Sequence, residues 1–320
     1  MGRADGPAHA DYILKVIAGN DAASSALAAS RRRSGALHAL DPASRAPPQR
    51  LPQGEIARSQ ERMGSLLFAA QTSIDRLFLA VGGVSCSVAL ADPNGVIVDR
   101  RGAPCDDCLF DGSGLWTGAV WSEKYEGANG IGTCIVEQRA VTIDRDQHFF
   151  TRNSDLFCTT APIFDERGEL AATLDASSCR GDLTDGFARL IASAVADAAR
   201  FIEAENFRLA FPNARILLAP TGDRYGSSLL AVDRDDLVVG ATRAARIGLG
   251  VDAATLKRPT PAADLIGRAR TENDDIGAAE RSVLQRALAR SRGNVSRAAR
   301  DLNMSRATFH RKMKELGLRG

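Results

Sequence analysis

Apolar residues follow two different spacings between residues 62 and 211. In residues 62–81 they recur every three or four positions, which predicts an amphipathic helix packed on a sheet. Its apolar stripe consists of Leu66, Leu67, Ala70, Ile74, Leu77, Phe78 and Val81. Residues 187–211 repeat the helical spacing and predict a second long helix.

Short apolar runs between these helices predict β-strands. The candidates are residues 85–92, 96–101, 140–144 and 159–177. Pro93, Asn94 and Gly95 supply turn residues for a first hairpin, and residues 165–168 supply them for a second. The order of helix, hairpin, loop-rich centre, hairpin and helix predicts an α+β sensor domain with an antiparallel sheet.

Three short helical patterns follow at the C-terminus. Gly293 suits the end of the first, and Asn294 or Ser296 can cap the second. Asn303 occupies the turn position where a left-handed residue is needed, and Ser305 can cap the third helix. Together they predict an all-α helix-turn-helix unit.

Composition sets broad limits on the protein class. With 320 residues, of which 44% are hydrophobic and 25% charged, the chain can form two or three globular domains. We expect a cytoplasmic protein without a membrane partner, because the apolar runs are short and the N-terminus lacks a secretory pattern. The net charge is only +2, yet residues 277–320 carry eleven Lys or Arg against three acids. A basic end of this kind is expected to meet phosphate.

The central segment carries a specific resemblance. Residues 114–180, which begin GLWTGAVWSEKYEGANGIGTC, resemble the sensory domain of the acetoin catabolism regulator family of bacterial enhancer-binding activators. The upstream segment ASRRRSGALHALDP, residues 29–42, resembles the N-terminal region of that family. The resemblance implies a GAF-like sensor whose effector is a small alcohol, aldehyde or ketone.

The C-terminal segment RGNVSRAARDLNMSRATFHRKMKELG resembles a Fis-type helix-turn-helix. The resemblance implies that Arg306 reaches a guanine, that neighbouring polar residues touch backbone or base, and that flanking cations hold phosphates. It also implies binding to double-stranded DNA as a two-fold homodimer. The candidate DNA-binding residues are Asn294, Ser296, Arg297, Ser305, Arg306, Thr308, His310, Arg311, Lys312 and Lys314. The alternative is a basic, solvated pair of helices.

We call the C-terminal helix-turn-helix the reader. The segment between the predicted sensor domain and the reader departs from that family. Its members carry a central ATPase, which needs a G-x-x-x-x-G-K-[ST] loop to wrap nucleotide phosphates, and the sequence contains no such loop. Residues 226–252 instead resemble the start of a PAS domain, followed by a linker with two prolines. The predicted organisation is an N-terminal helical or extended region at 1–60, a GAF-like sensor at 61–205, a partial PAS-like segment at 206–256, a linker at 257–276 and the reader at 277–320.

A ligand pocket is expected in the loop-rich centre of the sensor, since small-molecule sites combine apolar walls with a few polar groups. The candidate residues are Trp116, Trp121, Asn129, Cys134, His148, Phe149 and Asp175. The alternative is that the aromatic side chains simply cover the sheet.

The six cysteines leave three possibilities open. Cys105 and Cys108 form a C-x-x-C pair that can act as a redox dithiol or as half of a metal site. No second pair completes a metal site, and buried structural cysteines are common. We therefore expect structural cysteines and no cofactor. Metal binding and redox sensing are the alternatives.

The sequence thus predicts a non-enzymatic, ligand-responsive transcriptional regulator without ATPase activity. It can act by occluding promoters, by contacting RNA polymerase, or by competing with a full-length paralogue. The alternatives are a redox or metal sensor, a GAF-type thiol enzyme and an architectural DNA-binding protein.

Overall fold

The computed structural model describes residues 6–19, 25–221, 228–266 and 276–318. The remaining residues, which include parts of the predicted N-terminal region, PAS-like segment and linker, lie outside this description. Contacts divide the chain into two units, Met1–Thr260 and Pro261–Gly320.

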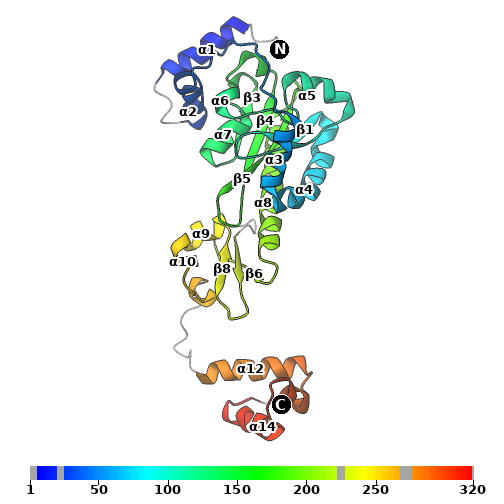
Figure 1. Ribbon diagram of the computed structural model, residues 1–320, viewed down its shortest axis with the longest axis vertical. Coiled ribbons are helices and arrows are strands. Elements are labelled where there is room, and N and C mark those ends of the chain that lie inside the picture. Colours follow the sequence, from blue (N-terminus) through cyan, green and yellow to red (C-terminus); the bar gives the residue numbers. More distant parts are fainter. Residues whose placement is uncertain (1–5, 20–24, 222–227, 267–275, 319–320) are drawn as a thin grey trace. The chain divides into compact units, whose positions relative to one another are not determined.

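The sensor is built on a five-stranded antiparallel sheet with the order β2-β1-β5-β4-β3 (Figure 1). Its strands are β1 (Cys86–Ala91), β2 (Ile97–Arg101), β3 (Val141–Asp144), β4 (Phe157–Phe164) and β5 (Leu170–Ser178). Both predicted hairpins are present, and the antiparallel α+β sensor fold is confirmed.

Two helices cover one face of this sheet. They are α4 (Ser65–Val81) and α8 (Asp185–Ala210). Their apolar faces form the main core with side chains from β1, β4 and β5. Ile74 of α4, Ile202 of α8 and Leu174 of β5 are examples, and each is fully buried. The helix predicted over residues 62–81 begins later, because Gly64 adopts φ 47° and separates α4 from α3 (Gln53–Met63).

Loops and short helices cover the opposite face. This layer contains α5 (Asp107–Ser113), α6 (Glu123–Glu126) and α7 (Gly130–Glu137). The helices α1 (Gly6–Ala18) and α2 (Ala26–Arg32) come from the N-terminal region, and α2 continues into a π-helical turn, Arg33–Leu37. Figure 1 shows these two helices beside the loop layer, where Ile13 packs with Ala128, Phe149 and Phe150.

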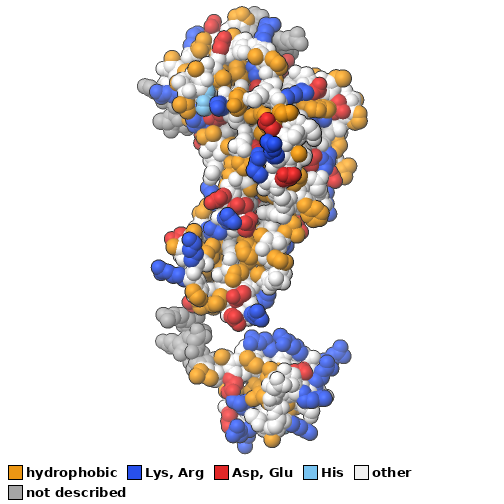
Figure 2. Space-filling model, in the orientation of Figure 1, with side chains coloured by type: hydrophobic (Ala, Val, Ile, Leu, Met, Phe, Trp, Pro, Cys, Tyr) orange, Lys and Arg blue, Asp and Glu red, His pale blue; other side chains and the backbone are white. Residues whose placement is uncertain are grey.

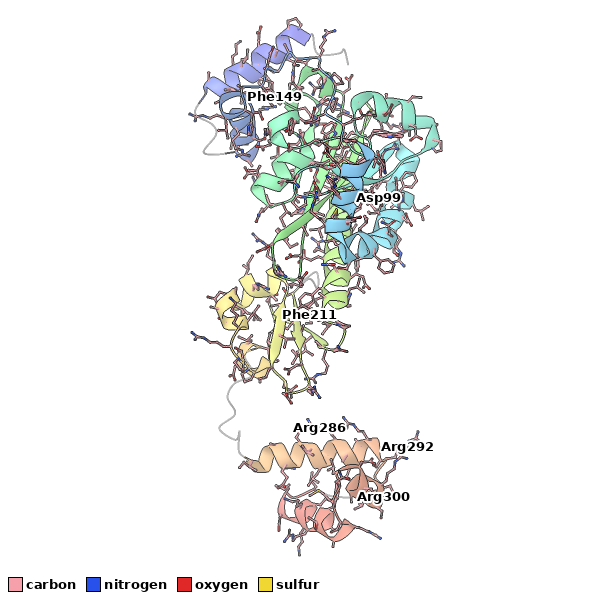
Figure 3. All side chains as sticks on the ribbon, in the orientation of Figure 1. Asp99, Phe149, Phe211, Arg286, Arg292 and Arg300 are labelled. Atoms are coloured by element: carbon pink, nitrogen blue, oxygen red, sulfur yellow. The ribbon has the colours of Figure 1, made fainter. Side chains whose placement is uncertain are left out.

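The segment predicted to be PAS-like forms a small sheet of its own. The strands β6 (Arg215–Leu218), β7 (Leu229–Val232) and β8 (Val238–Ala241) pair antiparallel in sequence order. The helices α9 (Arg243–Leu249) and α10 (Ala253–Leu256) follow. Phe211 packs on Phe207 at the end of α8, so the core of this segment is continuous with that helix (Figure 3).

The second unit contains the reader. After a short helix, α11 (Ala262–Leu265), it comprises α12 (Ile276–Arg290), α13 (Val295–Asp301) and α14 (Arg306–Glu315). Leu284, Ala298, Phe309 and Met313 form its core, so the apolar side chains of α14 face inward. Within the described residues, no helix is long and apolar enough to cross a membrane.

Candidate DNA-reading surface and sensor core

The geometry of the reader follows from its capping residues. Asn294 caps α13 by accepting a hydrogen bond from the Arg297 amide at 3.0 Å. Ser305 caps α14 in the same way, through the Thr308 amide at 3.0 Å. Asn303 adopts φ 52° in the turn between the two helices, as its residue type predicts. Ala299 is buried between α13 and its neighbours, where a small side chain permits close approach.

The exposed side of α14 carries cations. Arg306, His310, Arg311 and Lys314 are exposed, while the apolar residues of the helix point into the core. Blue side chains outnumber red ones on the visible face of the reader in Figure 2. Arg292 before α13 and Arg300 on α13, both labelled in Figure 3, add further exposed cations. This arrangement suits a helix that meets the phosphates and base edges of a major groove.

Besides the cap Asn294, several candidate DNA-binding residues make contacts within the reader, among them Arg311, which lies 3.9 Å from Glu315. Lys312 forms an ion pair with Glu280 of α12, and only 23% of its side chain is exposed. The Thr308 hydroxyl lies 2.8 Å from the Ser305 hydroxyl. Lys312 and Thr308 are therefore held by intramolecular contacts that the sequence did not reveal, and Ser305 acts through its cap. The remaining candidates, Ser296 and Arg297, lie on α13 and are half-buried and exposed respectively.

Trp121 and Asn129 have structural partners in the sensor. Trp121 is 1% exposed and donates its indole N–H to the Gly114 carbonyl at 2.8 Å. The Asn129 side chain caps α7 by accepting from the Gly132 amide at 2.8 Å, and it donates to the Gly127 carbonyl. These contacts fix the start of α7 over the centre of the sheet.

A buried polar cluster lies beneath α7. Asp175 on β5 accepts hydrogen bonds from Thr160 and Ser177, at 2.5 and 2.6 Å. Burial raises the pKa of Asp175 to about 6, although both hydrogen bonds favour the ionised form. Gly130, at the first turn of α7, leaves no room for a side chain against Thr160 and Asp175. The nearby Thr173 hydroxyl is buried and finds no hydrogen-bond partner among the described residues.

His148 lies in the same layer as a neutral side chain. Burial lowers its pKa to about 4. Its Nδ1 lies 3.0 Å from the Arg145 carbonyl, which can only accept, so Nδ1 carries the proton. Nε2 then accepts from the Cys158 thiol at 3.1 Å, and burial keeps that thiol protonated by raising its pKa.

The other pocket candidates lie at different depths. Phe149 is fully buried and meets Phe150 edge-on, with ring centroids 5.2 Å apart. Cys134 is fully buried on α7, where burial and then the charge of Asp175 raise its pKa. Trp116 is half-buried and stacks under the Arg100 guanidinium at 4.2 Å. Asn129, Cys134 and His148 thus lie buried within the loop layer and Asp175 lies beneath it on β5, whereas Trp116 is only half-buried.

The C-x-x-C pair is separate from this interior. Cys105 lies in the short 3-10 turn before α5 and Cys108 lies in the first turn of α5, and both are exposed. In the part of the chain that the structure describes, no group of three His, Cys, Asp or Glu side chains is placed to hold a metal ion.

Two sets of contacts escaped the sequence interpretation because they join distant segments. Arg33 pairs with Glu123 at 2.7 Å and with Glu137 at 2.9 Å, which ties the N-terminal helices to α6 and α7. Arg243 and Arg246 of α9 donate to the carbonyls of Gly168 and Glu166, in the β4–β5 turn. The basic run around Arg33 was visible in the sequence, but its partners were not.

Comparison with known families agrees with both parts of the chain. Residues 65–202 match the GAF domain family, and residues 276–316 match the bacterial regulatory proteins of the Fis family. The chain combines a GAF domain with a Fis-type helix-turn-helix. The predicted resemblance and fold are therefore confirmed, and this type of helix-turn-helix implies contact with DNA.

The curated relatives include longer regulatory proteins. The acetoin catabolism regulatory protein of Cupriavidus necator is 33% identical over 216 residues, which cover 66% of this chain and 32% of that protein. The acetoin dehydrogenase operon transcriptional activator AcoR of Bacillus subtilis is 28% identical over 132 residues, covering 41% of this chain and 22% of that protein. The matched regions thus span about a third or less of these relatives.

A solved structure has a similar fold. The crystal structure titled as the E. coli DhaR(N)-DhaL complex aligns with a TM-score of 0.51 and 19% identity, covering 75% of this chain and 81% of that chain. At this level of identity the similarity concerns the fold alone.

Proposed function

We propose that the protein is a cytoplasmic transcriptional regulator that binds specific double-stranded DNA as a two-fold homodimer. The observation that carries the proposal is the Fis-type reader, whose capped helix α14 exposes Arg306, Arg311 and Lys314. Cations placed around a recognition helix position it on phosphates and leave its N-terminal side chains for base edges.

We further propose that the GAF domain senses a small alcohol, aldehyde or ketone. The similarity to proteins named acetoin regulators supports this ligand class. The interior beneath α7 supports it chemically, because the buried Thr173 hydroxyl and Asp175 carboxyl can exchange hydrogen bonds with a hydroxyl or carbonyl group. Asn129 and Trp121 then act as positioning residues for α7 and its loop, and His148 holds Cys158 in place.

No ATPase or other catalytic role is proposed. The sequence contains no phosphate-wrapping loop of the ATPase type, and residues 257–276 alone separate the PAS-like segment from the reader. Output therefore comes from occupancy of DNA, from contact with RNA polymerase, or from competition with a paralogue for the same sites.

Sequencing of bound DNA tests the proposal. The full chain is incubated with random DNA fragments, with and without a panel of short diols, aldehydes and ketones, and bound fragments are sequenced. We expect a two-fold motif with half-sites about one helical turn apart, and occupancy that changes with one ligand class. An Arg306→Ala variant run in parallel should lose preference at one base position. Sequence-blind binding would contradict specific regulation, and a motif insensitive to every ligand would contradict the sensing role.

A further inference from the structure

Two of the six cysteines differ from the rest because their side chains are exposed. They are Cys105 and Cys108, the C-x-x-C pair. Free cysteines are usually buried, since the thiol packs as a small apolar group, so core packing does not account for this pair. Of the other four, three are buried and the last is half-buried: Cys86, Cys134, Cys158 and Cys179.

Burial protects the other four thiols from reaction. The thiolate is the form of cysteine that attacks a disulfide. Burial raises the pKa of Cys86 and of Cys179 to about 11. It also raises the pKa of Cys134 and of Cys158. These thiols therefore stay protonated near neutral pH, and an oxidant dissolved in water meets the exposed pair first.

The backbone that joins the two exposed cysteines is helical. Cys105 lies in the 3-10 turn Pro104–Asp106, and Cys108 is the second residue of α5. Side chains three positions apart lie on the same face of such a helix, with Cβ atoms about 5–6 Å apart. A disulfide needs a Cβ separation of about 3.5–4.5 Å, so an approach of ~1–2 Å is enough to form it. The spacing therefore lets the two sulfur atoms bond while α5 stays folded.

Two contacts attach α5 to the sensor domain. Asp107, between the two cysteines, forms an ion pair with Arg100 of β2 at 2.9 Å. Phe110 is fully buried and belongs to the same apolar cluster as Leu115 and Trp121. A bond between the cysteines would thus form beside an ion pair that joins α5 to the sheet.

We propose that Cys105 and Cys108 form a reversible disulfide, which gives the sensor domain a redox-active site. The co-reactant is a low-molecular-weight disulfide such as oxidised glutathione. One cysteine attacks it as the thiolate, forms a mixed disulfide and releases one glutathione. The second cysteine attacks the protein sulfur of that mixed disulfide and releases the other glutathione. Two protein thiols thus lose two electrons, and their protons pass to the two glutathione thiols that leave. The site is independent of the proposed small-molecule effector.

Equilibration of the full chain with glutathione tests the proposal. The protein is held without oxygen in mixtures of reduced and oxidised glutathione, quenched with acid and alkylated. Mass spectrometry then reads the tryptic peptide of residues 102–124, which contains both members of the pair and no other cysteine. Cys105→Ser and Cys108→Ser each leave one member. Cys179→Ser is the matched control, because it removes a half-buried cysteine outside the pair.

We expect the disulfide within residues 102–124, with an oxidised fraction that follows the square of the reduced glutathione concentration, because two glutathione thiols are released. An increase from about one tenth to about nine tenths oxidised should then take an ~80-fold change in [GSH]²/[GSSG]. Cys105→Ser and Cys108→Ser should instead hold one glutathione as a mixed disulfide, and Cys179→Ser should titrate as the wild type does.

Two results would overturn the proposal. The first is a wild type that stays a dithiol at every glutathione ratio or accumulates only mixed disulfides. The second is a wild-type disulfide that disappears in Cys179→Ser, because the bond would then join Cys179 to one member of the pair.

Discussion

Asp175 and His148 are both fully buried, and burial favours the neutral form of each side chain. Burial raises the pKa of the carboxyl to about 6 and lowers that of the imidazole to about 4. An unfolded Asp titrates near 4, so the native state holds the Asp175 proton to higher pH than the unfolded state does. This group therefore destabilises the fold as the pH rises from about 4 through 6. His148 acts oppositely, because the unfolded imidazole takes up a proton before the native one as the pH falls.

Replacing Asp175 separates its contribution to the pH dependence of stability from that of His148. Asn cannot ionise, so Asp175→Asn removes the loss of stability between pH 4 and pH 7. A shift of two pKa units corresponds to about 3 kcal/mol. We therefore expect the difference in unfolding free energy, variant minus wild type, to increase by an amount of that order as the pH rises from 4 to 7. The contribution of His148 cancels in this difference, because both proteins contain it. Urea denaturation at pH 4, 5, 6 and 7 measures the difference.

The exposed Asp155→Asn variant serves as the control for that measurement. Its difference from the wild type should not follow the Asp175→Asn curve, because Asp155 is outside the buried cluster. A flat difference for Asp175→Asn between pH 4 and pH 7 would show that the buried carboxyl does not titrate in this window.

Residue types alone located these groups but not their roles. The sequence grouped Asp175 and His148 as candidates for one pocket; in the structure Asp175 lies on β5 beneath α7, and His148 lies in the loop layer above the sheet. It could not show that the Asn129 side chain caps α7. Nor could it show that Trp121 is a buried core side chain whose indole N–H donates to the Gly114 carbonyl. Such roles depend on which backbone groups face a side chain after folding, and no spacing rule encodes that.

At the scale of elements, the recognition helix depends on a single cap. The Ser305 hydroxyl accepts from the Thr308 amide and satisfies one of the free donors at the start of α14. Ser305→Ala should weaken the first turn by about 1 kcal/mol. We expect hydrogen exchange of amides 306–309 to rise roughly five-fold, a ratio that corresponds to this energy. Mass spectrometry of exchanged peptides measures it.

Ser305→Asp separates the cap from the DNA contact. Asp is a good cap and its charge favours the N-terminus of a helix, so exchange should stay near the wild-type rate. The same charge would face phosphate, so DNA affinity should fall. If Ser305→Ala and Ser305→Asp raise exchange equally, the hydroxyl does not serve as the cap.

The elements themselves were largely predictable because their patterns are local. Apolar spacing located α4, α8 and both hairpins, and Asn303 and Ser305 marked the turn and cap of the reader. The start of α4 was misplaced because Gly64 interrupts a pattern that continues on both sides. The contacts of α9 with the β4–β5 turn were not predictable, since arginine donors there meet backbone carbonyls that any sequence provides.

At the scale of the whole molecule, charge is concentrated where DNA is expected to bind. The chain has a net charge of only +2, yet the reader exposes Lys314 and several arginines around α13 and α14. If the dimer makes roughly six to eight phosphate contacts, its affinity should fall about 10³- to 10⁴-fold between 50 and 200 mM salt, because each contact releases condensed counterions. Fluorescence anisotropy with a selected operator fragment measures this dependence, and an affinity independent of salt would contradict the proposed interface.

Two neighbouring lysines make that measurement residue-specific. Lys314 is exposed and has no ion pair among the described residues, whereas Lys312 is paired with Glu280. A lysine already neutralised within the reader displaces fewer counterions when DNA binds. We therefore expect Lys314→Ala to reduce the slope of log affinity against log salt by about 2 per dimer, one contact from each copy. Lys312→Ala should change the slope less and should instead loosen the packing of α14 on α12. Equal slopes for the two variants would show that the Glu280 pair opens on DNA and that Lys312 also holds a phosphate.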